Sequence, residues 1–156
     1  LGTAARSFAA IIMMAKGNLS KGEKIVLDVT QVWKKNGSRY RFAAVNHTLG
    51  KFYLQIFLRT GPKSLPFLVK NIGFLAKTIP FADRKAESCF NKAIEVSKEI
   101  GAKSILGQAY LDLAILHKAK NRLDQARESI SEAIPLFEKC EADVYLKQAK
   151  EVLMSL

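Results

Sequence analysis

The segment Gly61-Pro62-Lys63-Ser64 has an order close to the end of a phosphate-binding loop. Such a loop needs a glycine directly before its Lys-Ser pair, so that backbone amides can cradle a phosphate group. Here Pro62 occupies that position and has no amide hydrogen, and Phe57 stands where the first glycine of the motif should be. The segment therefore does not predict a nucleotide-phosphate site.

Histidine and cysteine side chains are widely scattered along the chain. His47 and His117 are the only histidines, and a zinc site would need Cys89 or Cys140 to converge on them. The two cysteines form no CxxC pair, which favours reduced thiols in a cytoplasmic protein. We expect no enzyme activity, no metal and no cofactor.

Positive charge is concentrated in the N-terminal half of the chain, which has a net charge of +11 over 156 residues. Residues 1–81 hold 13 lysines and arginines against two carboxylates, whereas residues 82–156 hold 12 of each sign. The densest cluster, WKKNGSRYR at residues 33–41, interleaves aromatic and basic residues that can stack bases and hold phosphates. Nucleic acid or another anionic surface is therefore an alternative partner. The Asn36-Gly37-Ser38 centre of the cluster is also typical of a turn between helices, where solvated lysines are ordinary.

Helical periodicity extends over almost the whole chain. Apolar residues recur at intervals of three and four in the segments 83–100, 104–119, 124–138 and 142–155. The expected N-caps are Asp83, Ser104 and Asp124, and Gly101 is the expected end of the first of these helices. No stretch shows the sustained alternation of a half-buried strand, so the predicted fold class is all-α.

Small and large apolar residues recur at a fixed distance, which indicates an internal repeat. The matching small-large-small sets are Ala126, Ile130 and Ala133 and, 40 residues earlier, Ala86, Phe90 and Ala93. Ala10 and Gly50 are again 40 residues apart. The pair Leu113-Ala114 matches Leu49-Gly50 at an offset of 64, so the middle copy carries 24 additional residues.

These copies resemble tetratricopeptide repeats, helix-turn-helix units with a small residue in helix A, an aromatic residue three positions later and small-large-small spacing in helix B. The third copy matches best, at Tyr110, Leu113, Ala114, His117, Leu123, Ala126, Ile130 and Ala133. The third copy departs from the family pattern at three positions. His117 replaces the usual aromatic residue, Asn121 replaces a frequent glycine, and a proline near Glu138 is missing. His117 is therefore expected to be a hydrogen-bonded core histidine. The 40-residue period resembles the longer repeats at the C-terminal ends of large bacterial signalling ATPases and adenylate or guanylate cyclases.

The resemblance implies a single domain over residues 1–156, in which helix pairs stack into a right-handed superhelix and complete their cores on their neighbours. The expected parts are repeat 1 at about 3–36, repeat 2 at about 38–100 with an insertion at 59–81, repeat 3 at about 104–140 and a capping helix at 142–155. The chain begins at Leu1 rather than at a methionine, which predicts a fragment of a longer protein. Phe8, Ile11 and Ile12 would then be exposed and favour a homodimer.

The resemblance also implies a binding module, because helix A of each repeat lines the concave face of the superhelix. Carried over position by position, the expected groove residues are Ser7, Ile11, Met14, His47, Lys51, Leu54, Gln55, Gln108, Leu111, Ile115 and Lys118. This mixed polar and apolar surface suits an extended peptide or a helix. The family's clamp for C-terminal carboxylates needs paired lysine and asparagine residues, and that set is not present. The predicted function is a non-catalytic protein-interaction module of a larger bacterial signalling protein.

The inserted segment KSLPFLVKNIGFLAKTIPF, residues 63–81, is largely apolar, and lysine is its only charged residue type. Ser64 is the expected N-cap of a helix over 65–79, with Pro66 in its first turn. Such a helix is too short to span a bilayer. One stripe is expected to pack on the repeats and to plug or extend the superhelix, namely Leu68, Ile72, Leu75 and Ile79. A dimer contact and an interfacial membrane helix are the alternatives.

Overall fold

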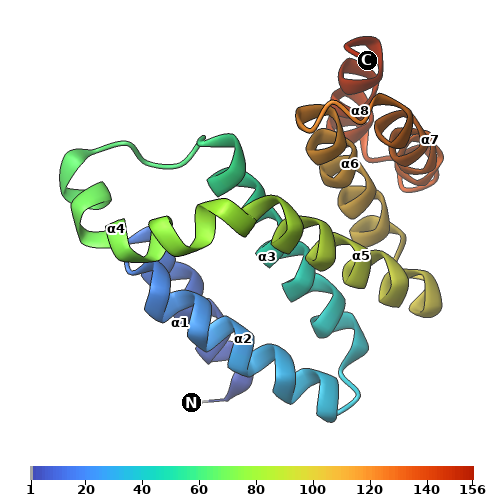
Figure 1. The fold of residues 1–156 in the computed structure, drawn as a ribbon. Helices are drawn as coiled ribbons and strands as arrows, with labels where there is room; N and C mark the ends of the chain where they lie inside the picture. Colours follow the sequence, from blue (N-terminus) through green and yellow to red (C-terminus); the bar gives the residue numbers. More distant parts are fainter. Residues whose placement is uncertain (1) are drawn as a thin grey trace.

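Helices form nearly all of the secondary structure in the computed structural model, which describes residues 2–156 (Figure 1). In chain order they are α1 (Thr3–Ala15), α2 (Leu19–Lys35), α3 (Arg39–Leu58), α4 (Leu65–Thr78), the 3₁₀ turn η1 (Ile79–Phe81), α5 (Ala82–Ile100), α6 (Lys103–Ala119), α7 (Leu123–Lys139) and α8 (Asp143–Met154). No strand occurs within residues 2–156, and the all-α prediction is confirmed.

The predicted helices have the observed bounds to within one residue at each end, but the predicted side-chain caps are wrong. Helices α5, α6 and α7 each begin before the expected cap, so Asp83, Ser104 and Asp124 lie inside their first turns. No side-chain hydrogen bond caps any of these three helices. The two carboxylates still interact favourably with the positive end of the helix dipole. Gly101 ends α5 as predicted, in the left-handed conformation with φ 69°.

The short turns between helices contain a residue with positive φ. Gly17 and Gly37 have this conformation after α1 and α2, and Asn121 has it after α6 with φ 57°. Asparagine tolerates the left-handed region better than most residues with a side chain. The replacement of a glycine by Asn121 therefore preserves the turn geometry that is found after the earlier helices.

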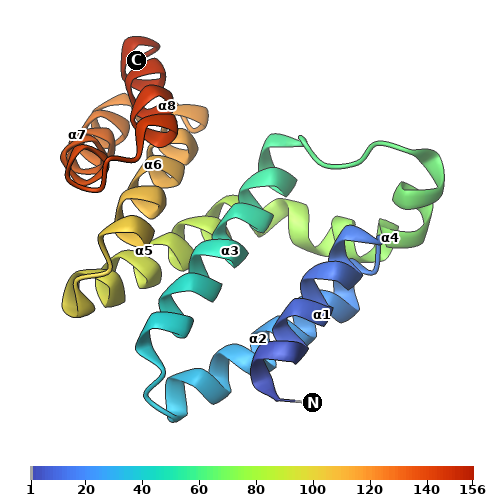
Figure 2. The same ribbon diagram turned by 180° about the vertical axis from the view of Figure 1, so that it is seen from behind.

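The helices pack in pairs, and α4 is the exception. Helix α1 packs on α2 and α6 packs on α7, whereas α3 skips α4 and packs most extensively on α5 (Figure 1, Figure 2). The second helix of each pair contacts the first helix of the next, which places α2 on α3, α5 on α6 and α7 on α8. This is the order expected for stacked helix pairs with one helix inserted in the middle pair.

Small residues allow the paired helices to approach closely. A Cβ atom on Gly50 in α3 would lie 2.5 Å from the ring of Phe90 in α5, and one on Gly107 in α6 would lie 2.8 Å from the ring of Phe137 in α7. Real Cβ atoms do not come this close to another heavy atom, so a side chain at either position would push the two helices apart. The contact of Gly50 with Phe90 involves two residues of the predicted small and large pattern, and Gly107 with Phe137 is a second close contact that the pattern did not include.

His117 lies in the core of the third pair, but it is not the hydrogen-bonded residue that was expected. Its ring is buried, and Nδ1 has no hydrogen-bond partner within residues 2–156. Burial disfavours the imidazolium form and lowers the pKa of His117 below its ordinary value. The side chain therefore fills the position of an aromatic residue at the cost of an unsatisfied polar atom.

Candidate partner-binding groove

A cavity of about 1000 Å³ opens between α1, α3 and α4 and the loop that joins α3 to α4. Its walls are mainly apolar and come from Ile11, Met14, Ala15, Leu19, Val26, Leu49, Phe52, Ile56, Pro62, Phe67, Leu68, Leu75 and Ile79. Its polar lining side chains are His47, Thr48, Lys51, Gln55, Arg59, Lys63 and Gln108. The cavity thus joins the helix-A face of the first two pairs to the inserted helix, and Gln108 of α6 extends it toward the third.

One polar stripe runs along the α3 wall of this cavity. His47, Lys51 and Gln55 follow one another at four-residue spacing, so they lie on one face of the helix, and Arg59 stands just beyond the end of α3. At a rise of 1.5 Å per residue, this stripe is about 12 Å long from His47 to Gln55. The cavity therefore has a polar edge on α3 and apolar walls on α1 and α4, which suits an elongated amphipathic ligand.

The charges that line the cavity are all positive. Lys51, Arg59 and Lys63 are exposed at its rim, and no carboxylate is among the lining residues. A ligand with acidic groups along one side and apolar groups along the other would match this distribution, because opposite charges across an interface favour association.

The expected groove residues divide between the cavity and other parts of the molecule. Those that line the cavity are Ile11, Met14, His47, Lys51, Gln55 and Gln108. Leu54 and Leu111 are buried in the core instead, because they face the interior side of α3 and α6. Ile115 packs against the core, and Lys118 donates a hydrogen bond to Ser155 Oγ at 2.6 Å.

Ser7 also lies away from the cavity. It is buried, and its hydroxyl donates a hydrogen bond to the Ala4 carbonyl oxygen at 2.7 Å. The groove residues predicted from the repeat pattern therefore converge around α1 and α3, and they do not form a continuous surface along α6.

The floor of the groove contains a buried pair that the sequence reading missed. His47 Nε2 in α3 lies 2.7 Å from Asp112 Oδ2 in α6, and both residues are buried. The contact joins the first helices of two successive helix pairs, so Asp112 holds the lining residue His47 in place. The sequence signal was Asp112 itself, a lone carboxylate in the otherwise apolar run AYLDLAIL.

The inserted helix α4 closes one side of the cavity through contacts with the first two pairs. Phe67 packs on the turn at Gly17, where an added Cβ would lie 3.0 Å from the ring. Asn71 is buried, and its Oδ1 accepts a hydrogen bond of 3.3 Å from the Leu19 amide at the start of α2. The Phe74 ring centroid lies 6.1 Å from that of Phe52 in α3.

The face of α4 that packs on the repeats differs in part from the predicted one. The packed residues Phe67, Asn71 and Phe74 recur at helical spacing, whereas Ile72 of the predicted stripe is exposed. Leu68 and Ile79 are only partly covered, at the rim of the cavity. The polar contact of Asn71 with the α2 amide and the fit of Phe67 on Gly17 set this orientation. Of the stripe expected to pack on the repeats, Leu68, Leu75 and Ile79 line the cavity, and the expectation is wrong for Ile72.

A second polar cluster joins the first repeat to the second behind the groove. Glu23 Oε1 in α2 accepts hydrogen bonds from the Tyr53 hydroxyl at 2.5 Å and from Lys85 Nζ at 3.1 Å. Lys85 also lies over the Tyr53 ring, 4.9 Å from its centroid. Burial and the nearby carboxylate raise the pKa of Tyr53. This cluster links α2, α3 and α5, and it holds α3 in register with the helices on both sides.

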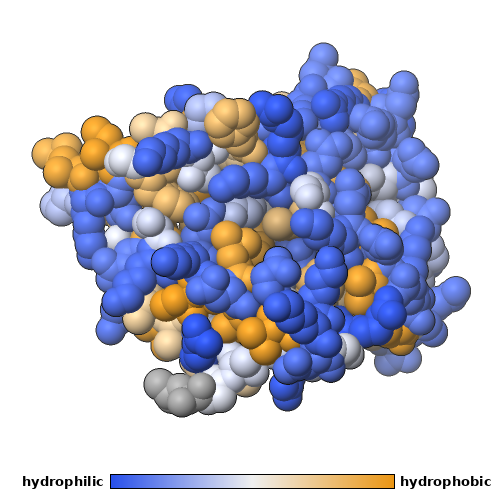
Figure 3. Space-filling view, turned by 60° about the horizontal axis from the view of Figure 1, so that its bottom comes forward, coloured by the Kyte–Doolittle hydropathy of each residue, from blue (hydrophilic) through white to orange (hydrophobic). Residues whose placement is uncertain are grey.

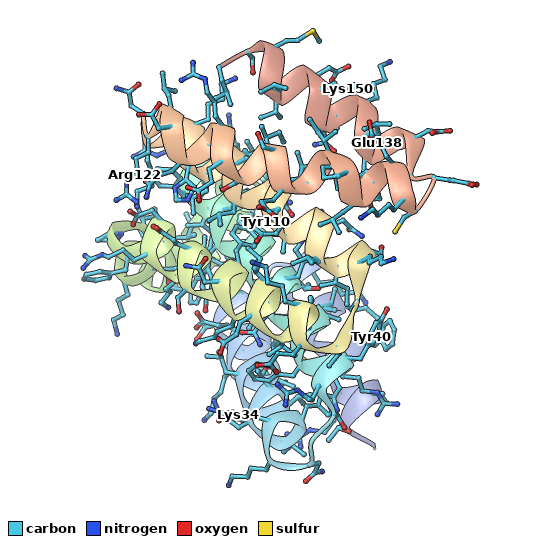
Figure 4. All side chains as sticks on the ribbon, turned by 90° about the vertical axis from the view of Figure 1, so that its right-hand side faces the viewer. Lys34, Tyr40, Tyr110, Arg122, Glu138 and Lys150 are labelled. Carbon is cyan, nitrogen blue, oxygen red and sulfur yellow. The ribbon has the colours of Figure 1, made fainter. Side chains whose placement is uncertain are left out.

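The basic cluster of residues 33–41 surrounds the turn between α2 and α3. Trp33 is buried in the core and cannot stack on a base, whereas Lys34 and Tyr40 lie at the outer surface (Figure 4). Arg39 forms an ion pair with Glu99 of α5. The cluster is therefore a solvated turn with one exposed aromatic ring, and the two-ring stacking surface suggested by the sequence is absent from the described residues.

Within residues 2–156, the side chains of histidine, cysteine and acidic residues form no group that could hold a metal ion. No helix in the same range is long and apolar enough to cross a membrane. Cys89 is buried in α5, where burial raises the pKa of its thiol to about 11, and Cys140 is exposed after α7.

Comparisons with protein-family models, with curated proteins and with solved structures find no match to this chain.

Proposed function

We propose that the chain is a non-catalytic protein-interaction module of tetratricopeptide type, which binds an amphipathic peptide or helix in the cavity between α1, α3 and α4. The observation that carries the proposal is the cavity itself, because residues from the first helices of successive pairs line it together with the inserted helix. A partner of a larger signalling chain, or another domain of that chain, would occupy it.

The repeat architecture supports this proposal. The 40-residue period, the sequential helix pairs and the close contact of Gly50 with Phe90 are features of such repeats. Repeats of this kind use the concave surface of their right-handed superhelix for binding. In this chain α4 narrows that surface on one side, which favours a partner that inserts one apolar edge.

The charge of the cavity favours an acidic partner. Lys51, Arg59 and Lys63 would approach carboxylates along one side of the bound segment, while its apolar side chains would enter between α1 and α4. Buried apolar side chains in such a groove provide most of the affinity, and the charges at the rim select the orientation.

Lys51→Glu tests this proposal, because Lys51 is exposed, lines the cavity and has no ion-pair partner within residues 2–156. Peptides selected from a random library on the wild-type protein are expected to carry acidic and apolar residues at helical or alternating spacing. Their dissociation constants, measured by fluorescence anisotropy, should rise about tenfold or more for Lys51→Glu, as expected when a charge pair becomes a repulsion.

Lys92→Glu, at an exposed position of α5 away from the cavity, is the matched control and should leave binding unchanged. Equal effects of the two variants, or a library that yields no groove-dependent peptide, would overturn the groove assignment. Leu111→Glu is unsuitable as a test, because it would place a carboxylate in the core.

The alternative function is binding of nucleic acid or another anionic surface by the basic N-terminal half. One observation favours it: Lys34, Lys35 and Arg41 are exposed around the turn between α2 and α3. A labelled mixed oligonucleotide that shows no mobility shift even at low salt excludes this alternative, because phosphate contacts are strongest there.

A further inference from the structure

The outer face of α4 exposes a row of large apolar side chains. Leu65, Val69 and Ile72 are 73%, 62% and 69% exposed. Their spacing of four and three residues places them on one side of the helix, distinct from the packed face with Phe67 and Asn71. None of the three lines the cavity. Hydrophobic residues gather at the left edge of the molecule in Figure 3, where α4 lies.

The outer face of α4 differs in position from the other exposed apolar residues. Phe8 and Val144 are also exposed, but they lie on α1 and α8, the first and last helices of the stack. Helix α4 is inserted between the two helices of the middle pair and lies at the edge of the molecule, far from α7 and α8 (Figure 1, Figure 2). Its outer face therefore requires an occupant of its own.

The charges of α4 indicate the chemistry of the occupant. Lys70 and Lys77 are exposed on the side of the helix between this face and the packed face, and neither forms an ion pair within residues 2–156. The sequence has no acidic residue between Asp28 and Asp83. In a symmetric dimer through α4, these lysines would face the same lysines of a second copy with no carboxylate of the helix between them. An anionic occupant is therefore favoured over a second copy.

We infer that the outer face of α4 docks on an anionic phospholipid surface, with the helix lying in the plane of the membrane. Its 14 residues span about 21 Å, which is too short to cross the hydrocarbon core. Leu65, Val69 and Ile72 would enter the boundary between headgroups and acyl chains, while Lys70 and Lys77 would contact lipid phosphates from the flank of the helix.

The shape of α4 favours a lipid surface over a protein partner. Protein interfaces concentrate their binding energy in side chains that fill pockets, and the cavity that could provide one lies on another side of α4. The outer face is a single ridge of side chains, which a fluid surface can surround without a complementary pocket. This surface is distinct from the α3 groove, so either proposal can fail while the other holds.

Vesicle flotation tests the inference with the whole chain. The wild-type protein should float with vesicles of phosphatidylcholine and phosphatidylglycerol in equal parts, and should stay unbound with phosphatidylcholine alone. Binding to the anionic vesicles should weaken as sodium chloride is added, because salt screens the lysines. Val69→Glu with Ile72→Glu should reduce partitioning by about a hundredfold, since two apolar side chains no longer enter the interface.

Val144→Glu is the matched control for the apolar face, because Val144 is 80% exposed on the distant helix α8, and it should bind as the wild type does. Lys70→Gln with Lys77→Gln tests the charges without disturbing any packed residue, and should weaken partitioning roughly 25-fold, about fivefold for each lysine. Circular dichroism spectra and unfolding temperatures should match the wild type for all of these exposed positions.

Three outcomes would overturn the inference. The first is equal binding of the wild type to neutral and anionic vesicles, and the second is equal vesicle binding by the α4 variants and the wild type. The third is a wild-type protein that binds no vesicles but cross-links to a protein partner, with that cross-link lost in the α4 variants. The last outcome would assign the face to a protein helix.

Discussion

At the scale of single residues, His117 is the buried polar group whose environment has the clearest consequence for stability. Burial lowers its pKa, so the folded protein holds the neutral imidazole at a pH where the unfolded chain already takes up a proton. The ordinary pKa of histidine is about 6.5. The contribution of His117 to the free energy of unfolding therefore becomes less favourable as the pH falls below about 6.5, until the folded protein also binds the proton.

His117→Phe should remove this part of the pH dependence. Phenylalanine supplies the aromatic ring that the repeat pattern expects. It also removes the buried nitrogen without a partner, which costs the folded wild type about 1–3 kcal/mol. Urea unfolding at about pH 7.5 and about pH 5.5 should show a smaller loss of stability on acidification than in the wild type. If the difference in unfolding free energy between the two pH values is the same in the variant and the wild type, His117 does not cause the pH dependence.

Residue-level features of the site were only partly predictable. The repeat pattern identified His47, Lys51 and Gln55 as groove residues because helix periodicity places them on one face of α3, and these three line the cavity. It also assigned Leu54 and Leu111 to the groove, although apolar residues on a face shared with the core become buried. Asp112 was missed because its partner His47 is 65 residues away, and no local spacing reports such a contact.

At the scale of helices, sequence periodicity was informative about where elements begin and end, and less so about which face packs. The helix predicted over 65–79 exists as α4 (Leu65–Thr78), and α3 packs on α5 rather than on α4. The apolar stripe indicated the side of α4 that lines the cavity, except at Ile72, but it did not indicate two contacts that hold α4, a hydrogen bond of Asn71 and the Phe67 ring on Gly17. These contacts depend on a turn in another repeat, so local hydrophobicity could not indicate them.

The packing of α3 on α5 can be tested by adding a single methyl group. Gly50→Ala should destabilise the protein by about 1–3 kcal/mol, because its Cβ would overlap the buried Phe90 ring and force the two helices apart. Gly73→Ala, inside α4, is the matched control, because an added Cβ would have no heavy atom within 4 Å apart from those of its own helix, and it should stabilise the protein by about 0.5–1 kcal/mol through helix propensity. Both values come from chemical unfolding at equilibrium. Equal effects of the two substitutions would contradict the close contact between α3 and α5.

At the scale of the whole molecule, contacts between successive pairs are uneven. Helix α5 packs extensively on α6, and Lys120 adds ion pairs to Asp83 and Glu87 that join the second and third pairs. Helix α2 packs less extensively on α3. In stacked repeats, stability is approximately a sum of repeat and interface contributions, so the weaker interface is the place where the stack opens first. The free energy of the opening that permits amide hydrogen exchange should therefore be lower in the first pair than in the third pair.

Glu23→Ala should deepen this difference, because it removes the acceptor of the buried Tyr53 hydroxyl and the ion pair with Lys85 that connect the first pair to the second. Leaving that hydroxyl unpaired costs about 1–3 kcal/mol. Hydrogen exchange read by mass spectrometry should then speed up in α1 and α2 while α6 and α7 keep their protection. Glu138→Ala, at an exposed position of α7, should change neither region. Equal loss of protection in every helix would contradict this prediction and would mean that the pairs open as one cooperative unit. In that case α4 would hold the first pair more tightly than its contacts with Gly17 and Leu19 indicate.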